Sequence, residues 1–242
     1  MDRITREIEH GKKISKDAEC IWGWKSPAGQ IRAERRANYL INLGRFNSAD
    51  KILEIGCGTG LFTEKVYKAT HATITAIDIS EDLLAQAKNK LPYVEFKVDD
   101  AMNTKFEDND FDGVYGSSIL HHLEIGKALL EILRILKPGG RMIFAEPNML
   151  NPQIFFERNV PLIKNWFGVS PDETAIIRWN LKKLLIKTGF TECTVFPYDF
   201  LHPFTPNCLI NTIKKTGEIC EKIPVLKEIA GSVIIYAQKP VN

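Results

Sequence analysis

The sequence has no long hydrophobic run and no strong charge of either sign. No window approaches ~18 consecutive apolar residues, the length that a membrane-spanning helix needs. Residues 1–20 are densely charged and lack an apolar core, so we expect no secretory signal there. The 242 residues include 32 Lys and Arg against 30 Asp and Glu, a net charge of +2. Because nucleic-acid-binding domains usually carry a basic patch or stripe, this balance argues against a nucleic-acid partner.

Cysteine is also scarce, and the spacing of the cysteines matches no disulfide or metal-binding motif. The five cysteines form no C-x-x-C pair and have no histidine at metal-ligand spacing; they are Cys20, Cys57, Cys193, Cys208 and Cys220. This pattern argues against a disulfide scaffold, predicts no metal site and is typical of reduced thiols in the cytoplasm. The hydrophobic content of 44% suffices to bury a core. We therefore expect a folded cytoplasmic protein with a small-molecule or lipid-linked partner.

Strand-like and helix-like segments alternate strictly from residue 51 to residue 146. Short apolar runs at 52–55, 73–77, 94–98, 111–115 and 141–145 predict strands, with helix-period segments between them. Such alternation predicts an α/β fold in three layers, with a parallel sheet covered by helices on both faces. The helix that starts near Glu124 is expected to stop at Lys137-Pro138-Gly139-Gly140, before a strand from Arg141. Further strands are predicted near 192–197 and 232–238.

The segments outside this alternation are expected to shape a ligand site. Residues 1–50 read as two helices and are predicted to form an N-terminal helical lid. Residues 51–242 then form the main domain, interrupted by insertions at about 147–178 and 198–231. The first insertion is rich in aromatic residues: Phe155, Phe156, Trp166 and Phe167. The second interleaves apolar residues with lysines, which suits a helix on a membrane surface or, more often, a core-facing helix with a solvated side.

A glycine-rich loop, Gly56-Cys57-Gly58-Thr59-Gly60, follows the first predicted strand. Glycines let the backbone turn sharply and let a ligand approach bare N–H groups. Asp78 ends the second strand 18 residues after Gly60, and in dinucleotide folds an acid at about this distance holds the ribose hydroxyls. However, the spacing is G-x-G-x-G, and Glu54 just before the loop would repel a pyrophosphate. A carboxylate at this position suits a cationic ligand better than an NAD-type cofactor.

At these residues the chain resembles the class I S-adenosylmethionine (SAM) dependent methyltransferases, especially the ubiquinone/menaquinone-type and small-metabolite enzymes. Five motifs occur in the family's order, at 54–60, 76–80, 98–101, 111–123 and 136–140. The resemblance implies a Rossmann-like sheet of seven strands, mostly parallel with one antiparallel strand. It also implies SAM as methyl donor and S-adenosylhomocysteine (SAH) as product. The cofactor contacts that it implies are Glu54, Gly56, Cys57, Gly58 and Gly60 in the loop, Asp78 on the ribose, Ile79, Asp100 and Ala101 on the adenine, and Ser117 beside the methyl.

Two assignments within the resemblance stay open between neighbouring residues. Family members often place an arginine before the first motif to pair with the SAM carboxylate. Arg36 is the candidate here, and Arg32 and Arg35 compete with it. Asp99 competes with Asp100 for the adenine amino group, and Asp100 is preferred because it directly precedes Ala101, as the family pattern requires.

Candidate catalytic residues follow the fourth and fifth predicted strands, at the end where open α/β sheets bind ligands. His121 or His122 can act as general base toward an acceptor hydroxyl, or can merely orient the loop. Glu146 can bind or deprotonate the acceptor, with Asn148 and Asn151 orienting it, or all three can supply turn chemistry. The histidines favour O-methylation of a small-molecule or lipid-linked metabolite. The alternatives are N- or C-methylation, an NAD-type oxidoreductase, and a non-catalytic SAM-fold binding protein.

Overall fold

The computed structural model describes residues 3–159 and 177–241. Within these ranges, seven strands form one sheet in the order β3-β2-β1-β4-β5-β7-β6. Strand β7 runs antiparallel to both of its neighbours, and the pairings among β1 to β5 are parallel. The predicted seven-stranded sheet with one antiparallel strand is therefore confirmed. The strands are β1 (Lys51–Ile55), β2 (Thr73–Asp78), β3 (Glu95–Val98), β4 (Phe111–Ser117), β5 (Leu136–Pro147), β6 (Thr191–Tyr198) and β7 (Ser232–Gln238).

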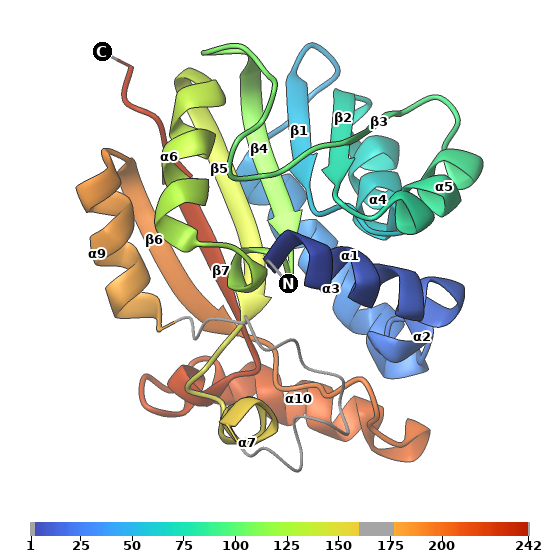
Figure 1. Ribbon diagram of the computed structural model, residues 1–242. Coiled ribbons are helices and arrows are strands. Elements are labelled where there is room, and N and C mark those ends of the chain that lie inside the picture. The colour runs from blue at the N-terminus through green and yellow to red at the C-terminus, as the bar shows by residue number, and fades with distance from the viewer. Residues whose placement is uncertain (1–2, 160–176, 242) are drawn as a thin grey trace.

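Helices cover both faces of the sheet and one end of it, as Figure 1 shows. The α-helices are α1 (Arg3–Ile14), α2 (Ala18–Ile21), α3 (Pro27–Gly44), α4 (Leu61–Thr70), α5 (Glu81–Lys90), α6 (Ile125–Ile135), α7 (Pro152–Asn159), α9 (Arg178–Thr188) and α10 (Ile210–Cys220). Short 3-10 turns are η1 (Ser15–Asp17), η2 (Leu120–His122), η3 (Asn207–Leu209) and η4 (Leu226–Ile229). No helix within the described ranges is both long and apolar enough to cross a bilayer.

The alternation of side chains along the strands separates two hydrophobic cores. Successive residues of a strand point to opposite faces, and both faces of the central strands are buried. On one face, Leu53 and Val114 pack with residues of α6 and α9 such as Leu129. On the other, Ile52 and Tyr115 pack with residues of α3, α4 and α5. This burial on both faces explains why the strand sequences are continuous apolar runs.

The start of β5 differs from the sequence prediction. Helix α6 ends at Ile135, and the strand begins at once with Leu136 instead of at Arg141. Leu136 pairs with Phe111, and the register then shifts before Gly113 pairs with Arg141. A β-bulge thus accommodates Pro138 and the two glycines inside the strand. From the sequence pattern alone, proline and glycine at these positions predict the end of an element.

The carboxyl ends of the parallel strands point toward the lower half of Figure 1, where α1, α7 and α10 gather. The N-terminal segment and both predicted insertions therefore meet at the end of the sheet where the motifs lie. Helix α1 packs on α5, and an added Cβ on Gly11 would lie 2.6 Å from the Ser80 hydroxyl. Trp166 and Phe167, predicted to contribute aromatic surface to the first insertion, and the side chain of Phe156 lie outside the described residues.

Candidate active site

The glycine loop turns sharply between β1 and α4. Gly56 and Gly58 have φ angles of +67° and +52°, in the left-handed region that other residues rarely adopt. The backbone N–H groups of Gly56 and Cys57 both donate to the carbonyl of Ile77, at 2.8 and 3.1 Å. A Cβ added to Gly56 would lie 2.5 Å from Ile119. Backbone conformation and lack of space therefore both require glycine at position 56.

Asp78, at the end of β2, holds this loop from the side. One carboxylate oxygen accepts from the backbone N–H of Gly58 at 2.8 Å and the other from that of Ser80 at 2.9 Å. Burial raises the pKa of Asp78 above its ordinary value. Ser80 is the N-cap of α5, accepting from Leu83 N–H, so Asp78 is not needed as the cap. The half-buried Ile79 lies between these two residues.

Glu54 lies beneath the loop and is nearly inaccessible to solvent, with an exposure of 1%. Its carboxyl group accepts a hydrogen bond from the Tyr115 hydroxyl at 2.9 Å. Burial raises the pKa of Glu54 to about 8. Burial also raises the pKa of the Cys57 thiol, which argues against a thiolate nucleophile. A cation bound nearby would favour the ionised form of Glu54.

Asp99 and Asp100 follow β3 and differ in the number of local contacts. Both carboxylate oxygens of Asp99 accept backbone N–H groups, from Asp100 at 3.0 Å and from Lys105 at 3.1 Å. Asp100 accepts one, from Met102 at 3.0 Å. The adjacent Ala101 is buried. Asp100 thus keeps more acceptor capacity for a ligand than Asp99, in line with the preference drawn from the sequence.

Arg36 is buried in α3, with an exposure of 3%. Its guanidinium donates to four hydroxyl groups at 2.7–3.2 Å; they belong to Ser117, Ser118, Tyr198 and Ser232. Within the described ranges it forms no ion pair with a carboxylate. The guanidinium carbon also lies 5.1 Å from the centre of the Trp24 ring. A buried cation that contacts hydroxyls and an aromatic ring but no carboxylate is poorly neutralised, so an anionic group of a ligand would suit this position.

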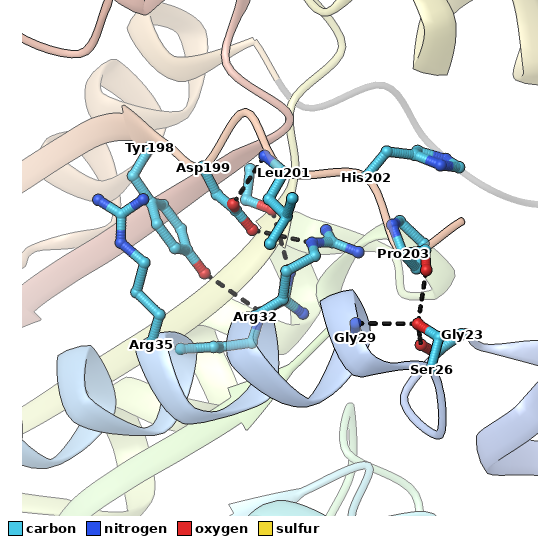
Figure 2. A network of polar contacts seen from close by, with 12 residues as sticks. Gly23, Ser26, Gly29, Arg32, Arg35, Tyr198, Asp199, Leu201, His202 and Pro203 are labelled. Carbon is cyan, nitrogen blue, oxygen red and sulfur yellow. Dashed lines mark hydrogen bonds and ion pairs between the residues drawn. The ribbon is translucent and has the colours of Figure 1, made fainter. Parts of the chain in front are cut away.

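The two competing arginines are already neutralised. Arg32 pairs with Asp199 at 2.9 Å, as Figure 2 shows. Arg35 pairs with Glu221 through two hydrogen bonds of 2.7 and 2.5 Å. Because each has its own carboxylate, these contacts favour Arg36 over both for binding a ligand carboxylate.

His121 and Glu146 form a buried pair at the ends of β4 and β5. The distance between His121 Nδ1 and a Glu146 oxygen is 2.7 Å. The other oxygen of Glu146 accepts the backbone N–H groups of Ile119 and Leu120, each at 2.9 Å. Burial alone would raise the pKa of Glu146, but His121 and these N–H groups hold it below its ordinary value. The carboxylate is therefore fully engaged in holding the histidine and its turn.

His122 lies against His121, with ring centroids 4.1 Å apart. Its Nδ1 is 3.3 Å from a carboxylate oxygen of Glu7 in α1, and its backbone carbonyl accepts from Arg3. The N-terminal helix thus contacts the histidine turn directly. His122 fastens α1, whereas His121 is fastened by Glu146.

Helix α2 and the segment that follows it cover the glycine loop. The Thr59 hydroxyl donates to Glu19 at 2.8 Å, and a Cβ added to Gly58 would lie 3.1 Å from the Trp22 ring. At the end of this segment the Ser26 hydroxyl donates to the carbonyl of Pro203, in the second insertion, as Figure 2 shows. The N-terminal segment therefore connects the glycine loop with the second insertion.

Asn148 and Asn151 have structural partners. The Asn148 side chain donates to the carbonyls of Glu228 and Ala230, both at 2.8 Å, and Asn151 donates to that of Ile229 at 2.8 Å. Both amides thus hold the end of the second insertion against the segment that follows β5. These contacts favour the turn role over acceptor binding.

The sequence analysis did not identify several residues of the site. Tyr198, Ser118 and Ser232 contact Arg36 but belong to three separate segments. Ser118 has a φ of +57°, unusual for a non-glycine residue. Serine and tyrosine occur throughout the chain, so no local pattern distinguishes these three. In the described part of the chain, no cluster of side chains suits a metal ion.

Comparison with known proteins identifies the family. Residues 53–144 match a family described as a methyltransferase domain. The O-methyltransferase cnsE of Penicillium expansum is 35% identical over 236 residues, covering 89% of this chain and 83% of the relative. A demethylmenaquinone methyltransferase of Paenarthrobacter aurescens (strain TC1) is 34% identical over 218 residues, covering 82% of each chain.

A solved structure shares the fold over nearly the whole chain. It is phosphoethanolamine N-methyltransferase 2 of Haemonchus contortus, in complex with phosphomonomethylethanolamine and SAH. The TM-score is 0.68 at 18% identity, covering 96% of this chain and 60% of the other. Neither an NAD-type oxidoreductase nor a non-catalytic binding protein fits these relatives. The chain belongs to the class I SAM-dependent methyltransferases and is an enzyme that methylates a small molecule with SAM as donor.

Proposed function

We propose that this enzyme transfers the methyl group to an oxygen atom of its acceptor, with His121 as general base. The observation that carries the proposal is the 2.7 Å contact between His121 Nδ1 and Glu146. SAM supplies a methyl group that its positive sulfur already activates. A hydroxyl acceptor, unlike a carboxylate or a phosphate, must still lose a proton to become a good nucleophile. A histidine held by a carboxylate suits that task.

The contact with Glu146 selects the tautomer of the neutral His121 ring that acts as the base. An ionised carboxylate only accepts hydrogen bonds, so the proton lies on His121 Nδ1 and Nε2 keeps its lone pair. Nε2 then takes the proton of the acceptor hydroxyl while the imidazolium that forms is stabilised by Glu146. Because both Glu146 oxygens are engaged by His121 and the backbone, Glu146 acts as a positioning residue and not as the base.

Each of the cofactor residues is assigned to one part of the SAM molecule. In this proposal Arg36 binds its carboxylate, Asp78 its ribose hydroxyls and the negative charge of Glu54 favours its cationic end. Ile79, Asp100 and Ala101 line the adenine, and the backbone of the glycine loop lies against the remainder together with Ser117. The fit is supported by Arg36, whose buried charge contacts hydroxyl groups and the Trp24 ring but forms no ion pair within the described residues.

Residues 1–50 act as a lid in this account. Trp22 and Glu19 contact the glycine loop, and Glu7 contacts His122. The lid thus contacts both the cofactor loop and the histidine turn, and in this proposal it shields the bound cofactor from water. Exclusion of water strengthens the electrostatic contacts within the site.

The proposal is tested with isotopically labelled methyl-SAM and a panel of phenols, alcohols, carboxylic acids and amines. Mass spectrometry of the products identifies the methylated atom. On a hydroxyl acceptor, His121→Gln is expected to lower kcat by about 10²–10⁴-fold, with SAH affinity unchanged. His71→Asn, at an exposed histidine after α4, is the matched control and should retain full activity. Methylation of amines alone, or full activity of His121→Gln on hydroxyls, contradicts the proposal.

A further inference from the structure

Exposed apolar side chains are concentrated in the second insertion. Of the 17 large hydrophobic residues that are exposed in the described part of the chain, seven lie between residues 204 and 229. They are Phe204, Leu209, Ile219, Ile223, Val225, Leu226 and Ile229, with exposures from 39% to 78%. Such concentration on a folded protein marks a surface that binds something.

Four lysines accompany these apolar residues: Lys214, Lys215, Lys222 and Lys227. None of them forms an ion pair with any residue that the structure describes. The acids of the same segment are mostly neutralised from outside it. Glu221 pairs with Arg35, and Glu228 pairs with Arg178 at 2.6 and 2.8 Å. Of the acids in this segment, Glu218 is then the one whose charge offsets the four lysines, so the net charge of the surface is positive.

The position of this surface relates it to the active site. Helix α10 lies at the end of the molecule to which β5 points in Figure 1. The turn at 228–230 is fastened by Asn148, two residues after Glu146. The apolar and basic surface thus lies at the same end of the sheet as the pair of His121 and Glu146. It belongs to the insertion that contacts the segment after β5.

We propose that residues 204–229 dock the enzyme onto an anionic phospholipid surface. The exposed apolar side chains enter the interface between headgroups and acyl chains, while the unpaired lysines contact the lipid phosphates. Charge complementarity argues for an anionic bilayer and against a second copy of this chain, since two copies would bring lysines together. The proposal concerns where the enzyme works and does not depend on which atom of the acceptor is methylated.

The test is co-sedimentation of the full chain with vesicles of phosphatidylcholine alone or of equimolar phosphatidylcholine and phosphatidylglycerol. Binding is expected on the anionic vesicles, weakening at high salt. Lys222→Gln combined with Lys227→Gln should lower the partition coefficient by about tenfold or more. Ile219→Ser combined with Val225→Ser, at side chains that are 59% and 78% exposed, should lower it by about tenfold.

Matched controls change equally exposed residues elsewhere. Leu130→Ser with Ile186→Ser, at exposures of 59% and 58%, and Lys88→Gln with Lys183→Gln should bind anionic vesicles as the wild type does. The proposal is overturned if no vesicle is bound, if both vesicle types are bound equally, or if control and test variants lose binding alike. It is also overturned if light scattering shows a dimer that Ile219→Ser with Val225→Ser dissociates, because a second copy then covers this surface.

Discussion

Two buried carboxyl groups of the site have pKa values shifted in opposite directions. Glu54 is buried and accepts from the neutral hydroxyl of Tyr115, and burial raises its pKa to about 8. Glu146 is equally buried, but His121 and two backbone N–H groups hold its pKa below the ordinary value. The difference lies in the number and charge of the donors. Glu54 is consequently poised to lose a proton when a cation binds, whereas Glu146 is permanently ionised near neutral pH.

The raised pKa of Glu54 predicts a loss of stability with rising pH. Between its ordinary pKa of 4.5 and about 8, the folded state keeps a proton that the unfolded state has lost, so the free energy of unfolding falls as the pH rises. Relative to Glu54→Gln, the wild type should lose up to roughly 4 kcal/mol across this window. Denaturant titrations from pH 5 to pH 8 measure the difference. Equal pH slopes in the two proteins would show that Glu54 ionises normally.

Glu146 should change the free energy of unfolding with pH in the opposite direction. Its lowered pKa means that its contribution to stability is complete above pH 4.5 and is lost as the pH falls through the folded-state value. At neutral pH, Glu146→Ala removes the partner of His121 and of two N–H groups, which should destabilise the fold by about 3 kcal/mol. Chemical unfolding at pH 7 checks this. A loss below 1 kcal/mol would mean that water replaces the carboxylate in these contacts.

At the scale of elements, α3 connects the cofactor side to the acceptor side. Its N-cap is Ser26, whose hydroxyl accepts from Gly29 N–H at 2.9 Å and contacts the carbonyl of Pro203. Along the same helix, Arg32 and Arg35 pair with Asp199 and Glu221. Helix α3 thus fastens the second insertion at several points, while Arg36 remains directed toward the ends of β4 and β6.

The N-cap of α3 gives a prediction at this scale. Ser26→Ala should reduce the free energy of unfolding by about 1–2 kcal/mol, because both the cap and the contact with Pro203 are lost. Ser80→Ala, at the N-cap of α5 with a longer hydrogen bond of 3.4 Å, should reduce it by about 0.5–1 kcal/mol. Thermal and denaturant unfolding of both variants provide the comparison. If Ser80→Ala is the more damaging, the contact with Pro203 contributes nothing.

The sequence pattern predicted those helices and strands that depend only on residues close together in the chain. Apolar runs predicted all seven strands. The prediction was wrong at Leu136, because the bulge depends on pairing with Phe111 across the sheet. It left the three arginines unresolved for the same reason: Asp199 and Glu221, which neutralise two of them, are more than 160 residues away in sequence.

At the scale of the whole molecule, the site exists because the carboxyl ends of several parallel strands meet at one edge. The glycine loop follows β1, Asp78 ends β2, Asp100 follows β3 and the pair of His121 and Glu146 links the ends of β4 and β5. The topology, established by alternation of strand and helix, therefore places residues from five segments together. The acceptor side is built from insertions whose sequence follows no such rule, which is why the motifs predict the cofactor and not the acceptor.

The most direct test of the account is calorimetric titration of SAH into the wild type and into Arg36→Met, with Arg35→Met as control. SAH should bind the wild type with a Kd of about micromolar magnitude, and Arg36→Met should lower the affinity by about 10- to 100-fold. Arg35→Met, whose arginine already pairs with Glu221, should bind nearly as the wild type does, with circular dichroism showing that both variants are folded. Unchanged affinity in Arg36→Met, or a larger loss in Arg35→Met, would contradict the assignment of the cofactor site.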